Sequence, residues 1–252
     1  MKQKIVLAVA IVASVLLAAC GGYVFCTQVK IEGFKELYAL IPTYIVLVLL
    51  SAVTEEMIHE GAHYLVGAML RMGVKIPQLR IFRSSSVEIN PKGVKGLRTR
   101  FVLTAGAGLF FDLLLIVWGV VSFAVPSVSP IYVALLPYAV YTFILNAAPL
   151  EYSGGKTDGL VIYEVLSGSD SSKVMFAVLR VQGLVNAGLP LKDVDESILM
   201  DVPQVQEDDI NFIILTQLRY EYYIAKGDEA NAQKYFDRYN ELIPYMPEDY
   251  RK

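Results

Sequence analysis

Residues 55–65, EEMIHEGAHYL, contain both histidines of the chain, His59 and His63, with Glu60 next to the first. Residues four apart lie on one face of a helix, so the two imidazoles can bind the same ion. Zinc lowers the pKa of a bound water to about 7, and a neighbouring carboxylate can remove its proton and later return it to a leaving amine. The His-Glu-x-x-His spacing is typical of this metal-assisted hydrolysis. We therefore predict that His59 and His63 bind zinc and that Glu60 is the catalytic base.

The same stretch is apolar enough to lie in a bilayer, yet residues 55–63 hold five ionisable side chains and no Lys or Arg. A charged side chain at the bilayer centre costs several kcal/mol. In a soluble helix the pattern would usually mean two solvated histidines, but in a membrane a positive charge must compensate. We predict one Zn²⁺ per chain, and we expect Glu56 to lie close to it.

A catalytic zinc site needs a third protein ligand and leaves a fourth position for water. The chain has no other histidine, and Cys20 and Cys26 lie far from the motif in sequence. The two cysteines are better interpreted as small buried apolar residues. The third ligand should therefore be a carboxylate, and the candidates in or near the membrane are Asp112, Glu151 and Asp158.

A second motif distinguishes these candidates. Asn146-x-x-Pro149 followed by Asp158-Gly159, downstream of the histidine motif, resembles the site-2 proteases, a family of intramembrane zinc metalloproteases. The resemblance covers about residues 37–165. It implies that Asp158 is the third zinc ligand, and that Asn146 and Pro149 shape the turn and the substrate cleft, with Gly159 beside the ligand.

Residues Gly106 to Asp112, GAGLFFD, resemble the glycine-rich helix motif of the same family, which usually ends in Asn. Asp112 is therefore expected to act in one of three ways: as a hydrogen-bond acceptor next to the zinc ligands, as a protonated structural acid, or as a competing ligand. Small residues let membrane helices approach closely. We interpret Gly106 and Gly108 as packing residues.

The composition indicates a membrane protein with a soluble part, because 55% of its residues are hydrophobic and only 19% are charged, against about 25% in average soluble domains. Four apolar stretches are long enough to cross a hydrocarbon core about 30 Å thick: residues 5–25, 37–70, 101–125 and 131–150. The first could instead be a processed signal, because residues 17–20 resemble a lipoprotein cleavage site. We favour four retained crossings.

Basic residues predict the orientation. Residues 71–100 hold eight basic side chains and one acid, Glu88, and so are expected on the cytoplasmic side. Both termini are then cytoplasmic, in what we expect to be an integral protein of a bacterial plasma membrane. The uncharged loop at 125–130 faces outward. This topology brings both histidines and Asp158 to one side of the membrane.

The fold class predicted is an α-helical polytopic membrane protein with a short β-hairpin in its cytoplasmic loop and a small α-helical C-terminal module. Three regions follow: an N-terminal membrane helix with a short external loop at 1–36, a metalloprotease core at 37–165, and the module at 166–252. Alternating apolar and polar residues predict the hairpin at 75–90. An extended peptide could pair with its edge, although it could equally be a simple connection.

The C-terminal region is acidic, with 18 acidic and 10 basic residues from 151 onward, whereas 1–150 hold 7 acidic and 12 basic ones. Residues 160–189 are predicted to be helical and 190–210 to be loop-like. Residues 210–242 are predicted to form two helices broken at Gly227-Asp228. Their spacing resembles one tetratricopeptide repeat, with an ordinary helical hairpin as the alternative.

These features predict an intramembrane zinc metalloendopeptidase that cleaves a peptide bond in or near the membrane segment of a membrane-anchored protein. One alternative is a catalytically silent relative that acts as a membrane scaffold or regulator. Another is a prenyl-protein peptidase, since Glu55-Glu56 resembles its paired glutamates, but the arginine and further histidines it needs are absent. A protein partner for the C-terminal module is expected, and a nucleic-acid partner is not.

Overall fold

The structure is a computed structural model, and it describes residues 1–29, 34–75, 89–125, 129–152 and 155–246. The described part is mainly helical and includes one small antiparallel sheet. The chain divides into two compact units, which are described separately. The first unit comprises Met1–Val66, Ile76–Val87 and Leu103–Ile162, and the second comprises Gly67–Lys75, Glu88–Val102 and Tyr163–Lys252.

Among the described residues, three helices are long and apolar enough to cross a membrane: α1 (Lys2–Gln28), α2 (Phe34–Met69) and α3 (Leu97–Ala124). A shorter apolar helical stretch follows, formed by the 3₁₀ helix η1 (Pro130–Ala134) and by α4 (Leu136–Ala147). Its residues 131–147 fall short of the roughly 20 that a crossing needs. The described chain thus has the character of a helical membrane protein, and the fourth crossing stays a prediction.

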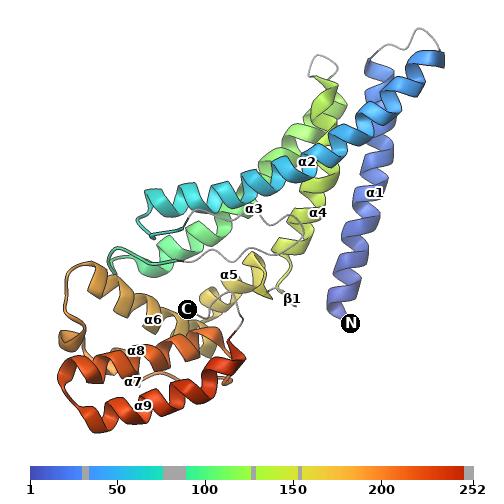
Figure 1. Ribbon diagram of the computed structural model, residues 1–252. Helices are drawn as coiled ribbons and strands as arrows, with labels where there is room; N and C mark the ends of the chain where they lie inside the picture. Colours follow the sequence, from blue (N-terminus) through green and yellow to red (C-terminus); the bar gives the residue numbers. More distant parts are fainter. Residues whose placement is uncertain (30–33, 76–88, 126–128, 153–154, 247–252) are drawn as a thin grey trace. The chain divides into compact units, whose positions relative to one another are not determined.

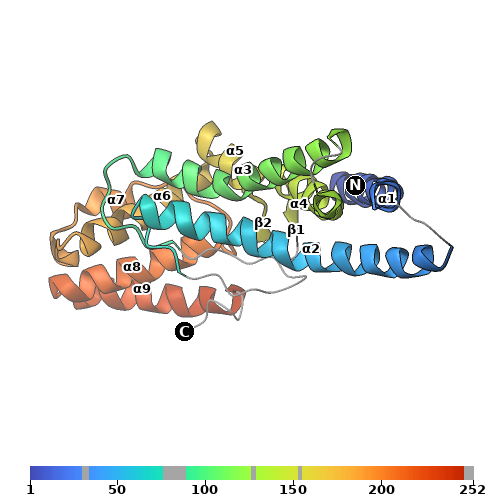
Figure 2. The same ribbon diagram turned by 90° about the horizontal axis from the view of Figure 1, so that it is seen from above.

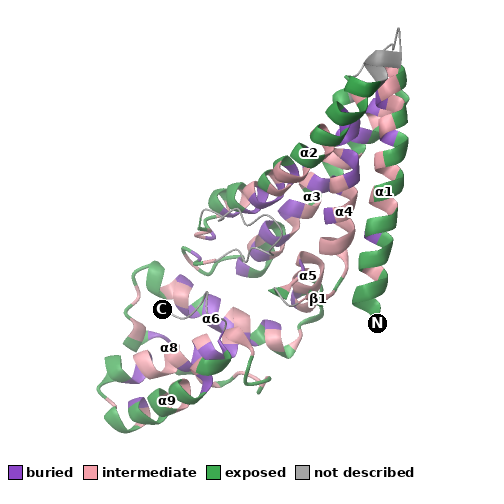
Figure 3. Ribbon diagram, turned by 45° about the vertical axis from the view of Figure 1, so that its right-hand side comes forward, coloured by how far each residue is buried: buried purple, intermediate pink, exposed green. Residues whose placement is uncertain are grey.

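The surface of α1 explains why it needs a lipid environment. Val9, Val12 and Val15 are 54%, 58% and 62% exposed, and Figure 3 shows exposed residues along most of the helix. A contiguous apolar surface of this kind is rare on soluble proteins. Ala10 and Phe25, by contrast, are buried within the first unit.

The long helices of the first unit alternate in direction. Figure 1 shows α1 alongside α4. The Gln3 side chain, at the start of α1, donates to the carbonyl of Glu151, which follows α4. At the other end of α1, the Gln28 side chain donates to the carbonyl of Ser122, near the end of α3, at 3.4 Å. The chain therefore passes back and forth, as the hydropathy pattern predicted; which end is cytoplasmic stays a prediction.

The second unit holds the C-terminal helices α6 (Asp170–Asn186), α7 (Glu196–Met200), α8 (Ile210–Lys226) and α9 (Glu229–Leu242). Leu199, Ile213 and Leu215 are fully buried in its core. Figure 2 shows α8 and α9 side by side.

The break between α8 and α9 at Gly227-Asp228 is confirmed. Gly227 ends α8 in the left-handed conformation, with φ of 75°, and the Asp228 side chain accepts from the Asn231 N–H to begin α9. A glycine and an Asp at these positions are the usual stop and start signals of helices.

Residues 160–189 are mainly helical, as predicted, but the helical stretch is interrupted. The structure has two helices there, α5 (Asp158–Ser167) and α6. Gly168 adopts φ of 70° between them, and the Ser169 side chain accepts from the Ser172 N–H as the N-cap of α6. The region predicted to be loop-like also contains α7 and the short 3₁₀ helix η2 (Leu191–Asp193).

Residues 76–88 of the predicted β-hairpin lie outside the described residues. The segments that flank them pair through their backbones in the second unit. The Asn90 N–H donates to the Met72 carbonyl, and the Lys92 N–H donates to the Arg71 carbonyl, both at 3.0 Å. Gly73, with φ of 62°, lets the chain turn against Asn90.

Replacing Gly73 with Ala tests this packing. The new Cβ would overlap the Asn90 carbonyl group at a φ that side chains disfavour. Gly96 has the same φ of 62° but open space around it, so Gly96→Ala is a matched control. We expect Gly96→Ala to lower the free energy of unfolding by about 1–2 kcal/mol, and Gly73→Ala by on the order of 3 kcal/mol. Denaturant unfolding of the purified chain in detergent measures both, and equal effects would contradict the packing.

Candidate metal centre

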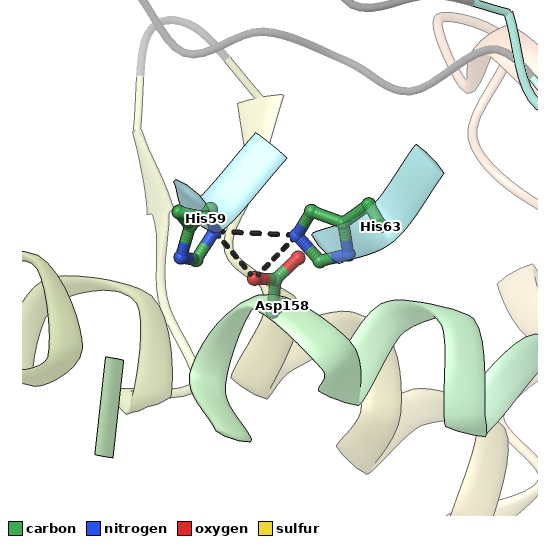
Figure 4. A group of neighbouring side chains, drawn as sticks. All are labelled: His59, His63 and Asp158. Atoms are coloured by element: carbon green, nitrogen blue, oxygen red, sulfur yellow. Dashed lines mark hydrogen bonds and ion pairs between the residues drawn. The ribbon is translucent and has the colours of Figure 1, made fainter. Parts of the chain in front are cut away.

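The structure brings the three predicted metal ligands together within the first unit. His59 and His63 lie one turn apart on α2, and their Nε2 atoms are 3.2 Å apart. Asp158 is the first residue of α5, and its Oδ2 lies 3.2 Å from His59 Nε2 and 3.3 Å from His63 Nε2. Figure 4 shows the three side chains pointing toward one another. Both imidazoles are 4% exposed, so the site is closed to bulk solvent on that side.

A short β-ribbon returns the chain to the imidazoles after α4. Strands β1 (Glu151–Tyr152) and β2 (Gly155–Lys156) pair antiparallel, with Glu151 opposite Lys156. Thr157 follows, and its hydroxyl donates to the Ala148 carbonyl at 2.6 Å and accepts from the Leu160 N–H at 3.2 Å. These bonds begin α5 at Asp158.

The next residue, Gly159, allows α5 to start close to the end of α4. A Cβ at this position would lie 2.6 Å from the carbonyl carbon of Ala147, which is far inside van der Waals contact. A glycine is therefore required here by close approach, and any side chain would move Asp158 away from the imidazoles. The Asp-Gly pair that marked the second motif thus has a physical reason.

Each imidazole is held by a hydrogen bond from its other nitrogen. His59 Nδ1 donates to the two carboxylate oxygens of Asp112, at 2.9 and 3.0 Å. His63 Nδ1 donates to the backbone carbonyl of Thr104, at 2.7 Å. Because both acceptors lie at Nδ1, the proton belongs there and each Nε2 presents its lone pair toward Asp158.

Three acceptor atoms within 3.3 Å of one another need a positive charge between them. Zinc in tetrahedral coordination, with bonds of about 2.0–2.1 Å, would space its ligand atoms by about 3.3 Å, close to the edges of 3.2–3.3 Å formed by His59, His63 and Asp158. Two imidazoles and one carboxylate are also a donor set of catalytic zinc sites. The residues present therefore fit a zinc ion.

The Asp158 carboxyl has the charge that a ligand needs. Burial raises the pKa of Asp158, but positive charge on His59 and His63 would outweigh the burial and lower the pKa to about 2, and a bound cation at the same place would act in the same direction. Asp158 is therefore anionic at neutral pH. Its negative charge would offset part of the charge of a divalent ion in these apolar surroundings.

Glu60 is buried, at 7% exposure, on the helix that carries both imidazoles. Its Oε2 atom has no hydrogen-bond partner among the residues that the structure describes. A buried carboxylate oxygen without a partner is unfavourable. The position is suited to an acceptor that takes a proton from a water molecule.

The structure favours the first of the three expected roles for Asp112, because this fully buried side chain accepts from His59. Asn146 reaches the site at the limit of hydrogen bonding, with its Nδ2 3.5 Å from His59 Nε2. Pro149 is exposed and Glu56 is half-buried. Within the described part of the chain, neither Pro149 nor Glu56 forms a hydrogen bond or ion pair with His59, His63 or Asp158.

Gly108 has a different role from the one predicted. The sequence predicts a residue of helix packing, but the space beside Gly108 is filled by the candidate metal ligands His59 and His63. A Cβ at Gly108 would lie 2.6 Å from the Nε2 atoms of both His59 and His63. At Gly106 the nearest atom would be 3.8 Å away, on Ile162, which is ordinary contact.

Sequence reasoning missed three residues that support the site. The Thr142 hydroxyl donates to Glu55 Oε2 at 3.0 Å, and both side chains are buried. Glu55 can form a group with His59 and Asp112 whose ligand atoms lie within 4.8 Å of one another. Since His59 Nδ1 already donates to Asp112, we interpret this group as support for the imidazole. Glu55 lies four residues before His59, a spacing that could have indicated a shared face, whereas Thr142 and the Thr104 carbonyl carried no motif.

Comparison of the chain with protein-family models, with curated proteins and with solved structures found no match. The resemblance to the site-2 proteases therefore depends on the two sequence motifs alone. The spacing of the three ligand atoms is a property of the folded chain and does not depend on that resemblance.

Replacing Gly108 with Ala should disrupt metal binding, because the methyl group would occupy the space of both Nε2 atoms. Gly106→Ala is a matched control on the same helix, two residues away, and should leave metal content unchanged. Both changes improve helix propensity by up to about 1 kcal/mol, so a loss confined to Gly108→Ala cannot come from the helix itself. Zinc content of purified protein measures the effect, and equal zinc in the two variants would contradict this geometry.

Removing the acceptor at Asp112 should weaken zinc binding about 10- to 100-fold, the usual effect of losing the partner of a metal-binding histidine. Asp112→Leu keeps the approximate volume and removes the acceptor. Asp112→Asn keeps one side-chain oxygen that can accept from His59 Nδ1, and we expect it to retain most of the affinity. Competition against a zinc chelator gives the two affinities, and an unchanged affinity in Asp112→Leu would exclude the role.

Proposed function

We propose that this chain is an intramembrane zinc metalloendopeptidase of the site-2 protease type. The single observation that carries the proposal is the cluster of His59, His63 and Asp158, whose ligand atoms lie 3.2–3.3 Å apart beside the buried Glu60. The Asn146, Pro149 and Asp158-Gly159 motif supports the family assignment.

The chain's own side chains have distinct roles in this proposal. His59, His63 and Asp158 hold the ion, and Asp112 keeps the His59 ring oriented. Bound zinc supplies a water molecule acidic enough to lose a proton near neutral pH. Glu60 accepts that proton as a general base and later donates it to the leaving amine.

The substrate class follows from the position of the site. His63 precedes the end of α2, at Met69, by six residues, or about 9 Å along the helix axis. Asp158 lies outside the candidate membrane spans. A site near one end of a membrane helix favours peptide bonds in or next to the membrane segment of an anchored protein. Because a helix hides its carbonyls in hydrogen bonds, that segment must be extended where it is cleaved.

Two substitutions separate binding of the ion from catalysis. Glu60→Gln keeps the shape of the side chain but cannot accept a proton, so we expect normal zinc content and turnover lower by about 10²–10⁴-fold. Asp158→Ala removes a ligand and should abolish both zinc content and turnover. Zinc stoichiometry of the purified chain and the membrane proteome of cells carrying each variant are the measurements.

Asp170→Ala is the matched control, because Asp170 also lies in the first turn of a helix and contacts only Lys173 at the surface. It should retain zinc and activity. The membrane proteome of Glu60→Gln cells should accumulate an uncleaved membrane-anchored protein. A purified wild-type chain without stoichiometric zinc would overturn the proposal, and an unchanged proteome in Glu60→Gln cells would favour a scaffold.

A further inference from the structure

Three exposed basic residues lie between the end of α2 and the start of α3. Arg71 follows the last residue of α2, Met69, by two positions, and Lys95 precedes the first residue of α3, Leu97, by two. Lys92 is the third, and all three are exposed. We refer to Arg71, Lys92 and Lys95 as the cationic cluster. Because α2 and α3 are candidate membrane spans, the cluster belongs at the depth of lipid headgroups.

Backbone hydrogen bonds hold the cluster together. The Lys92 N–H donates to the Arg71 carbonyl at 3.0 Å. The Arg100 guanidinium donates to the Arg71 carbonyl at 2.6 Å and to the Lys95 carbonyl at 3.2 Å. The Arg100 side chain thus joins both chain segments, and the three cations extend from a backbone that is already ordered. A binding surface formed in this way loses little conformational entropy on binding.

No acid neutralises the cluster within the described part of the chain. None of the ion pairs there involves Arg71, Lys92 or Lys95. The segments 67–75 and 89–102 contain no Asp or Glu at all. Like charges held close together repel one another, so the arrangement is stabilised when an anion binds.

Arg71 has an unfavourable backbone conformation. Among the described residues, it is the one residue other than glycine with a positive φ, 54°. Glycine would adopt this conformation without strain. An arginine at this position is strained, and the one thing that it adds relative to glycine is its side chain. Strain of this kind is often retained where the side chain has a function.

We propose that the cationic cluster binds the phosphate headgroup of an anionic phospholipid in the leaflet that surrounds this end of α2 and α3. Juxtamembrane basic residues attract anionic lipids by roughly a fivefold gain in affinity each. A free phosphate ion is also an anion, but its attraction to the cluster is screened over about 8 Å at physiological salt. Lipid phosphates are instead held at the depth of the cluster. The proposal does not depend on the metal centre or on proteolysis.

The test compares the full chain with a variant that lacks the cluster, Arg71→Gln/Lys92→Gln/Lys95→Gln. Thermal unfolding of the protein in zwitterionic detergent is followed while short-chain phosphatidylglycerol, short-chain phosphatidylcholine or glycerol phosphate is added. Phosphatidylglycerol alone should raise the unfolding temperature of the wild type. The triple variant should need about 100-fold more of it, as three fivefold losses predict.

Two further variants make the result specific. A control triple variant removes three exposed cations elsewhere in the second unit: Arg180→Gln/Lys192→Gln/Lys234→Gln. It lowers the net charge, −3 in the wild type, by the same amount as the variant that lacks the cationic cluster. This control should respond to phosphatidylglycerol as the wild type does. Arg71→Gly relieves the backbone at φ of 54°, so it should fold at least as stably without lipid and still lose about fivefold in affinity.

Three outcomes would overturn the proposal. An equal shift with phosphatidylcholine would mean that the headgroup charge is not recognised. An equal shift with glycerol phosphate would make the occupant a soluble anion. An equal loss in the control triple variant would mean that net charge, and not the cationic cluster, determines the response.

Discussion

Two imidazole nitrogens and a carboxylate oxygen lie within 3.3 Å of one another, in a chain whose neighbouring helices are otherwise apolar. Lone pairs that face each other at this distance repel, and the repulsion is stronger in surroundings of low dielectric constant. The hydrogen bonds from His59 to Asp112 and from His63 to Thr104 favour protons at both Nδ1 atoms, so each neutral ring presents its Nε2 lone pair to the centre. A positive charge at the centre of the triangle would make the arrangement favourable, and a bound divalent ion would supply it.

The chain brings the three side chains together in two ways. The histidines need only one turn of α2, which any helix provides. Asp158 must return from a distant part of the chain, and small residues set the distance at which it does so. Gly159 lets α5 begin against the end of α4, and Gly108 leaves room for both rings beside α3. Both glycines lie where a single methyl group would displace a ligand, so their role is steric and does not concern backbone flexibility.

Features that depend on local periodicity could be predicted from the sequence. The pair His59 and His63 follows from the helical repeat, and the break at Gly227-Asp228 follows from stop and start signals within two residues. Features that depend on which helices face one another could not be predicted from the sequence. The role of Asp112 required knowing that it faces His59, and Thr142 donates to Glu55 across helices that no motif connects. The break between α5 and α6 was not predicted, although Ser167-Gly168-Ser169-Asp170 contains the turn and N-cap residues that mark it.

Hydrolysis in a membrane requires water at a site that lipid surrounds, and the position of Asp158 suggests how both needs are met. The two histidines approach from inside a membrane helix, whereas the third ligand begins a helix that follows the last apolar stretch of the core. If α2 crosses a membrane, a centre formed by α2 and the start of α5 would lie near the membrane boundary. Water could reach it there without crossing the hydrocarbon core. In the proposed function, the buried Glu60 beside the histidines would accept a proton from that water. In the proposed function, the motif at His59 and His63 would provide the metal chemistry, and the motif at Asp158 would place it near the membrane boundary.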